Sequence, residues 1–191
     1  MARIGILFLG RKRPGFDPKW GGRVEALVRP MLNALPHEVV YFDRSVADDA
    51  TLQEALAAFG REGVDVPVSL QPTMSDGRLA PRLGQLWPGP VVLWATPENP
   101  CSPKVSSCSL VGTHVFAANL RQLHRPFELV FGMPGEPETA RELDKACRVA
   151  YACKKLHAAK IGLIGYHAPG FIDMHADPTA LSAQTGAELF H

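Results

Sequence analysis

The chain has 191 residues, 46% of them hydrophobic, and its 20 Lys and Arg against 19 Asp and Glu give a formal net charge of +1. This length allows one full core and part of a second, and the absence of a basic tract argues against nucleic acid as a partner. With no apolar run long enough to span a membrane, no signal peptide and no Cys-x-x-Cys pair among its four cysteines, we expect a cytoplasmic protein with reduced thiols.

Apolar runs alternate with amphipathic patterns along the first 158 residues. The pattern predicts strands at 4–9, 38–42, 66–70, 91–94 and 127–131, and helices at 20–35, 51–62, 78–86, 110–123 and 136–157. This β-α alternation predicts an α/β fold, namely a Rossmann-like doubly wound parallel sheet with helices on both faces. Pro67 within the third strand indicates an edge strand or an early position in the ladder.

The pattern restarts near residue 159. It predicts a strand at 161–164, a long loop, a helix at 179–185 and a further strand from residue 189. A lone β-α-β unit cannot bury its own apolar faces. We therefore expect domain 1–158 to be followed, at 159–191, by the opening β-α-β of a second, incomplete α/β domain.

The loop after the first strand carries three cations, at residues 11 to 13, and is followed by Trp20-Gly-Gly22. The first strand of a doubly wound sheet usually lies centrally, and its carboxyl end reaches the ligand edge. Arg11 and Arg13 could hold a polyol hydroxyl or a phosphate through charge-assisted hydrogen bonds. The alternative is a solvated basic loop.

Two further loops follow the third and fourth strands. Gln71 and Thr73 could bond sugar hydroxyls, whereas Asp76 in a Ser-Asp-Gly turn is expected to cap the next helix. Glu98 is the one carboxylate at the end of the fourth strand and could act as a general base. Because no partner carboxylate or histidine lies at a telling spacing, a structural or binding role is favoured for it.

The segment from Ser106 to His114 opens the helix after the fourth strand. Ser109 and Gly112 would allow an N-cap and close packing of the helix on the sheet. His114 lies on a mostly apolar face, where a satisfied core histidine is more common than a ligand.

Histidine and aspartate alternate in the loop after the sixth predicted strand. A divalent metal would accept such ligands, but the spacing matches no known site rule, and we expect no metal site there. The four side chains are His167, Asp173, His175 and Asp177.

Three stretches together resemble the N-terminal region of the L-fucose/L-arabinose isomerase family. They are GRKRPGFDPKWGG after the first strand, PVVLWATPENPCSPKVSSCSLVGTHVFAANLRQLHR in the middle, and IGLIGYHAPGFIDM near the end. No single motif is diagnostic, and the order and spacing of the motifs carry the resemblance.

The resemblance implies a set of substrate contacts. Related isomerases have a substrate-contacting arginine in the turn after their first strand, which would be Arg11 or Arg13 here. They have an aromatic residue that covers the sugar where this chain has Met74, and a Ser-Met-Gly stretch where it has Ala168-Pro169-Gly170. The expected substrate-binding residues are Arg11, Arg13, Trp20, Gln71, Thr73, Met74, Ser109, His114, His167 and Pro169.

The family resemblance also implies a chemistry, the interconversion of an aldose and a ketose through an enediol. A divalent metal, usually Mn²⁺, holds neighbouring sugar oxygens, and carboxylates move the proton. The metal ligands and the acid and base belong to later domains of the family, so no catalytic or metal residue is assigned here. We expect this chain to supply pocket walls and contacts within a homo-oligomer, and to be inactive alone.

The alternative is a non-catalytic α/β module that binds a sugar or a sugar phosphate. A nucleotide is disfavoured as the ligand, because neither GxGxxG nor GxxxxGK[ST] occurs in the sequence.

Overall fold

The structure is a computed structural model that describes residues 1–11, 14–171, 173–174 and 176–190. The chain forms two compact units, Met1–Tyr151 and Ala152–His191, and each is described by itself. The division falls within the longest helix, and the predicted domain boundary at residue 158 stays a prediction. Within the described part of the chain, no helix is long and apolar enough to cross a membrane.

The first unit is built on a five-stranded sheet in the order β2-β1-β3-β4-β5. Every neighbouring pair is parallel, which confirms the predicted α/β fold. Parallel strands need a crossover between them, and a helix follows each strand of this sheet. The strands are β1 (Arg3–Phe8), β2 (Glu38–Tyr41), β3 (Val66–Leu70), β4 (Val91–Ala95) and β5 (Phe127–Phe131).

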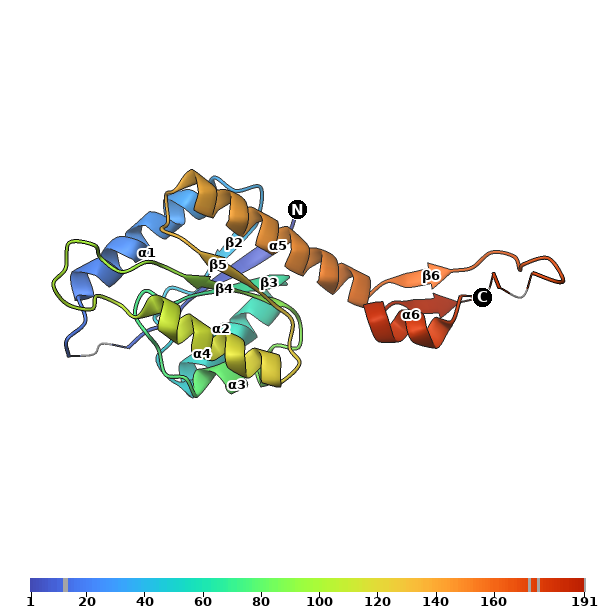
Figure 1. The fold of residues 1–191 in the computed structure, drawn as a ribbon, viewed down its shortest axis with the longest axis horizontal. Coiled ribbons are helices and arrows are strands. Elements are labelled where there is room, and N and C mark those ends of the chain that lie inside the picture. The colour runs from blue at the N-terminus through green and yellow to red at the C-terminus, as the bar shows by residue number, and fades with distance from the viewer. Residues whose placement is uncertain (12–13, 172, 175, 191) are drawn as a thin grey trace. The chain divides into compact units, whose positions relative to one another are not determined.

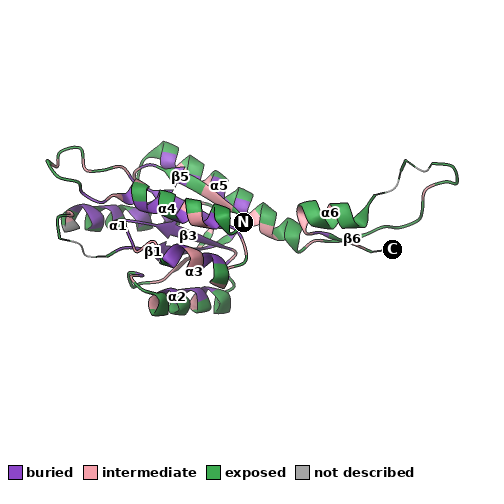
Figure 2. Ribbon diagram, turned by 60° about the horizontal axis from the view of Figure 1, so that its bottom comes forward, coloured by how far each residue is buried: buried purple, intermediate pink, exposed green. Residues whose placement is uncertain are grey.

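Helices cover both faces of this sheet (Figure 1). One core cluster joins the strands to α1 and α5, and a second joins them to α2, α3 and α4. Because both faces are covered, β3 and β4 are buried along their whole length, and Figure 2 shows β3 in purple. The helices are α1 (Pro18–Asn33), α2 (Asp49–Arg61), α3 (Leu79–Leu86), α4 (Ser109–Gln122) and α5 (Pro137–His157).

Local sequence signals account for where these helices begin. Asp17 accepts a hydrogen bond from the Lys19 backbone N–H at the start of α1, and Asp48 caps α2 by accepting from the Thr51 N–H.

Pro67 is a partial exception to the prediction that it marks an edge strand or an early ladder position. It lies in the central strand β3 and not at an edge, but it precedes Val68, the first residue of β3 that pairs with β4, so no ladder hydrogen bond is lost there.

The second unit contains a β-α-β arrangement, as predicted. The strands β6 (Lys160–Gly162) and β7 (Glu188–Phe190) pair in parallel on either side of α6 (Pro178–Thr185). Asp177 caps α6, and Gly186 ends it with a positive φ of 78°. No residue of α6 is buried. Large apolar side chains in this unit stay exposed, among them Ile161, Leu163, Ile164, Phe171 and Phe190.

Candidate functional site

The loops after β1, β3 and β4 are tied together at the carboxyl edge of the sheet. The Asp17 backbone N–H donates to the Ser106 carbonyl at 3.0 Å, and the Met74 N–H donates to the Ser107 carbonyl at 2.7 Å. Open parallel sheets bind their ligands at this edge, near the point where the strand order reverses. In this sheet the reversal lies between β1 and β3.

A cleft of about 960 Å³ opens at this edge, beside the start of α1. Its walls come from α1 and from the loops after β1, β2 and β3. The described lining residues are Gly10, Arg11, Pro14, Gly15, Phe16, Gly21, Gly22, Glu25, Ser45, Ala47, Pro72 and Thr73. Glycines, prolines and one aromatic ring dominate this lining, so its few polar side chains decide what it binds.

Arg11 is held at two points in the cleft. Its carbonyl accepts a hydrogen bond from the Thr73 hydroxyl at 3.3 Å, and its guanidinium lies 2.9 Å from the Asp76 carboxylate. Asp76 also binds the side chain and the backbone N–H of Arg78. These Arg78 hydrogen bonds, with the Arg11 charge adding to them, hold the pKa of Asp76 well below its usual range. The structure thus brings Arg11 and Thr73, two of the predicted residues, into one cleft.

Asp76 lies in the turn before α3, but the cap expected of its side chain is absent, because Arg78 is the N-cap residue and α3 has no side-chain cap hydrogen bond. Its backbone carbonyl accepts from the Leu79 N–H at 3.0 Å, at the start of α3. Its carboxylate also fixes Arg11 across the cleft edge, which the Ser-Asp-Gly motif does not reveal.

Glu25 is a cleft residue that the sequence analysis missed. It is the one carboxylate among the described residues that line the cleft, and burial raises its pKa above the usual value. One signal could have identified it, the Gly21-Gly22 pair. Residues three and four apart lie on one helix face, so two residues without side chains lie next to Glu25 on α1.

Glu98 has the structural role favoured by the sequence analysis. Its carboxylate accepts five hydrogen bonds at 2.6–3.0 Å, from the backbone and side chains of Ser106 and Ser107 and from the Cys108 N–H. Burial raises its pKa, but these hydrogen bonds outweigh burial and lower the pKa to about 2. A carboxylate at the N-terminus of α4 also meets the positive end of the helix dipole. All its strong acceptor positions are used within the loop.

Gln71 and Met74 lie against α4 and not in the cleft lining. Gln71 is 1% exposed, and its Oε1 accepts from the N–H and the hydroxyl of Ser75. A Cβ at Gly112 would lie 2.2 Å from this Oε1 and 2.9 Å from Met74 Cγ, so the glycine permits the close approach expected for it. Whether either side chain contacts a substrate stays a prediction.

Trp20 and Ser109 are buried. The Trp20 ring lies in the core, and its Nε1 donates to the Pro97 carbonyl at 3.3 Å. The Ser109 hydroxyl accepts from the Thr96 N–H at 2.9 Å, which ties α4 to the end of β4. Their predicted substrate roles stay predictions.

His114 corrects one expectation, because it is exposed and is not a core histidine. The buried face of α4 follows helical spacing through Ser109, Gly112, Thr113, Phe116 and Leu120, and residue 114 falls off that face. Arg13 lies outside the described residues.

The second unit holds the last two predicted site residues. The His167 ring stacks at a tilt on Tyr166, with 4.1 Å between the ring centroids, and Pro169 is exposed. Asp177 caps α6 through the Thr179 and Ala180 N–H groups, and His175 lies outside the described residues. Over the described ranges, no group of three or more His, Cys, Asp or Glu side chains could hold a metal ion. The Mn²⁺ that the family resemblance implies therefore finds no fitting ligand set there.

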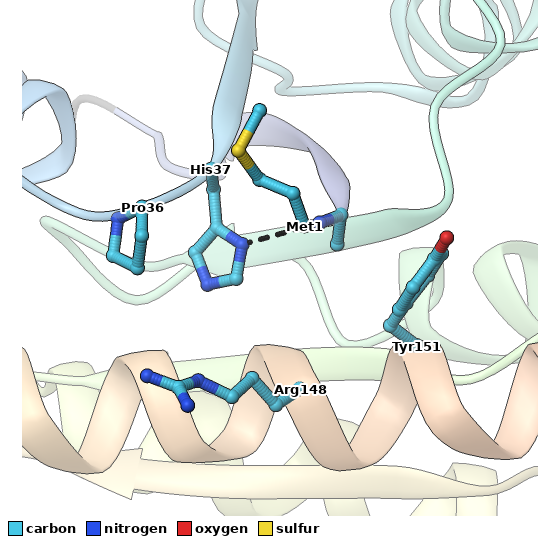
Figure 3. A pocket seen from close by; sticks show the side chains of 6 residues that line it. Met1, Pro36, His37, Arg148 and Tyr151 are labelled. Atoms are coloured by element: carbon cyan, nitrogen blue, oxygen red, sulfur yellow. Dashed lines mark hydrogen bonds between the residues drawn. The ribbon is translucent and has the colours of Figure 1, made fainter.

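A smaller hollow of about 330 Å³ lies at the opposite, amino edge of the sheet, where Met1, Ala2, His37, Arg148 and Tyr151 are among the lining residues (Figure 3). Buried His37 lies between the Ala2 N–H and the Asp144 carboxylate, which is 3.1 Å from its Nε2. Burial lowers the pKa of His37 against the opposing effect of Asp144. This edge carries the amino ends of the strands, where parallel sheets do not place their ligands.

The chain is similar to proteins named sulfoquinovose isomerase. Those of Priestia aryabhattai and Priestia megaterium are each 26% identical over 151 residues, covering 79% of this chain and 34% of the relative. That of Alkalicoccus urumqiensis is 28% identical over 117 residues, covering 61% of this chain and 26% of the relative. The chain thus spans about a third of the length of the curated relatives it matches.

No family model matches the chain. The names of the relatives support a relationship to sugar isomerases. They do not specifically support the L-fucose/L-arabinose isomerase family that the sequence motifs resemble.

Proposed function

We propose that this chain is the N-terminal part of a metal-dependent aldose–ketose isomerase and supplies walls of the sugar pocket. The observation that carries the proposal is the similarity to sulfoquinovose isomerases along 79% of the chain. The cleft at the carboxyl edge of the sheet supports it, since ligands of such folds bind there. We further propose that the intact protein is a cytoplasmic homo-oligomer, in which this part contributes contacts between subunits.

Sulfoquinovose is the first candidate substrate. It is an aldose that carries a sulfonate, so a site for it needs hydroxyl partners and an anion partner. Arg11, fixed by Asp76 and Thr73 on the cleft wall, would bind the anionic group through charge-assisted hydrogen bonds. L-fucose and L-arabinose, which carry no charge, are the second candidates.

In this proposal the chain binds and orients the sugar and moves no proton. Glu98, the carboxylate that the sequence singles out as a possible base, has its oxygens engaged by five hydrogen bonds. The family resemblance implies that the ligands of a divalent ion such as Mn²⁺ would come from later domains, and the described residues offer no fitting cluster.

The test compares the 191-residue chain with the product of the full reading frame. Each is assayed for ketose formation from sulfoquinovose, L-fucose and L-arabinose, before and after removal of divalent metal. We expect turnover by the longer protein alone, lost with EDTA and restored by Mn²⁺. Turnover by the 191-residue chain would contradict the proposal that it supplies only walls of the pocket.

The alternative is a non-catalytic module that binds a sugar or a sugar phosphate. The cleft itself favours this reading in one respect, since its described lining has a single carboxylate and acid–base catalysis on a sugar commonly uses two groups. A reading frame that ends at His191, together with sugar binding and no turnover, would support this alternative.

A further inference from the structure

The Glu25 carboxylate has hydrogen-bonding capacity that none of the described residues uses. It makes no hydrogen bond or ion pair with any residue that the structure describes, although it lines the cleft. An ionised carboxylate offers two oxygens with about four acceptor positions. Glu25 is exposed to solvent, so its carboxylate can accept hydrogen bonds from a ligand that enters the cleft.

The helix surface next to Glu25 is bare. A Cβ at Gly22 would meet no atom within 4 Å, and one at Gly21 would touch only the Thr73 and Pro72 wall at 3.4 Å or more. Glycine in a helix costs about 1 kcal/mol relative to alanine. Open space beside Gly22 therefore leaves room for a ligand to lie against the helix and reach Glu25.

Arg11 supplies the opposite chemistry in the same cleft. A guanidinium has five N–H donors, and the hydrogen bond from Arg11 to Asp76 uses Nη1. Asp76 is shared between Arg11 and Arg78, so the three side chains together keep one positive charge. Arg11 therefore stays available to an anion while its position is fixed.

We propose that the cleft selects a polyol with a single anionic group and binds it in one orientation, with hydroxyls donating to Glu25 and the anionic group accepting from Arg11. The ring of Phe16, which lines the same cleft, would cover an apolar face of the ligand. The assignment rests on the proposed function and deepens it, because it makes Glu25 a specificity-determining residue for the sugar end.

The test measures binding of three probes to the 191-residue chain by calorimetry or NMR titration. Sulfoquinovose has both ends, glucose lacks the anion, and ethanesulfonate lacks the hydroxyls. We expect Glu25→Gln to lower the affinity for sulfoquinovose and for glucose by about tenfold, and to leave the affinity for ethanesulfonate unchanged. Arg11→Gln should reduce sulfoquinovose to the affinity of glucose and abolish ethanesulfonate binding.

Two controls separate binding from folding. Glu142→Gln on α5 and Arg121→Gln on α4 make the same charge changes at exposed positions outside the cleft, and should leave all three affinities unchanged. Gly22→Leu extends a side chain into the open space beside Glu25 and should weaken all three probes, while the unfolding midpoint stays at or above that of the parent chain.

Three results would overturn the assignment. They are an absence of binding of every probe at about 10 mM, an equal effect of Glu25→Gln on all three probes, and equal effects of Glu25→Gln and Glu142→Gln. The proposed function fails separately. An intact protein that isomerises no aldose would refute the proposed function, even if the two variants change the three affinities as expected. An active isomerase whose affinity for the sugar is unchanged by Glu25→Gln would refute only the assignment of Glu25.

Discussion

The loop after β4 and the cleft lie at the same edge of the sheet, but their polar side chains differ in what they bind. In the loop, the Glu98 carboxylate takes hydrogen bonds from two buried serines and from the first backbone N–H groups before α4. In the cleft, Glu25 makes no hydrogen bond or ion pair with any of the described residues. The Glu98 carboxylate is thus engaged by the loop itself, whereas the Glu25 carboxylate is open to a ligand that enters the cleft.

The comparison also distinguishes a loop that positions its neighbours from a cleft that can bind a ligand. The β4 loop holds the β1 loop through Asp17 and the β3 loop through Met74, so it fixes the two loops that carry Arg11 and Thr73. We infer that substitution of Glu98 would alter the cleft indirectly, by loosening the loops that line it. Substitution of Glu25 would leave the fold unchanged.

Glu98→Ala tests the hydrogen bonds of the loop after β4 and should have the largest effect on stability. Because the buried Ser106 and Ser107 would lose their carboxylate partner, we expect the free energy of unfolding to fall by about 3 kcal/mol. Urea denaturation at neutral pH measures it. Glu142→Ala, at an exposed position on α5, should change stability by no more than about 0.5 kcal/mol, and equal losses in the two variants would show that the loop does not depend on Glu98.

A second prediction compares two helical glycines, one in each region. Gly112→Ala would place a methyl group 2.2 Å from Gln71 Oε1, and should cost about 2 kcal/mol despite the better helix propensity. Gly22→Ala enters open space and should stabilise the chain by about 0.5–1 kcal/mol. Thermal unfolding of both variants measures the difference, and a stabilised Gly112→Ala variant would contradict the close packing of α4 on the β3 loop.

The architecture could be predicted from the sequence because its physical signals are local. Apolar runs and caps predicted the five strands of the first sheet to within one residue at each end, and the helices follow from amphipathic spacing. His114 shows the limit of such signals. A position one or two residues off the buried face of α4 is exposed, and composition around it does not reveal the rotation of the helix.

The site was predicted less completely, for a different reason. Sequence shows which residues carry polar groups but not whether those groups are already paired. Gln71 was predicted to bind sugar hydroxyls and is engaged by Ser75, while Glu25, which the sequence analysis did not single out, lines the cleft. Pairing depends on contacts between loops that are distant in sequence, such as Arg11 with Asp76, and no local pattern encodes them.

The smallest expected effect concerns the pH dependence of the two carboxylates, whose pKa shifts have opposite signs. The pKa of Glu98 is lowered from 4.5 to about 2, so its contribution to stability is complete above about pH 4.5 and is lost as the pH falls towards 2. The pKa of Glu25 is raised by burial, so the folded chain binds that proton more tightly than the unfolded chain, and Glu25 lowers stability once it ionises.

Glu98→Gln should therefore flatten the acid loss of stability between about pH 4.5 and 2. Because Glu25 is exposed and water screens its charge, Glu25→Gln should raise stability at neutral pH by no more than about 0.5 kcal/mol and leave the acid loss in place. Urea denaturation over this pH range measures both, with Glu142→Gln as the control for the lost charge. If Glu25→Gln lowered stability at neutral pH, Glu25 would have a stabilising partner within the protein, and the distinction between the paired Glu98 carboxylate and the open Glu25 carboxylate would fail. A small gain in stability would instead indicate that the carboxylate is kept at a cost to the fold, which is expected of a residue retained for a ligand.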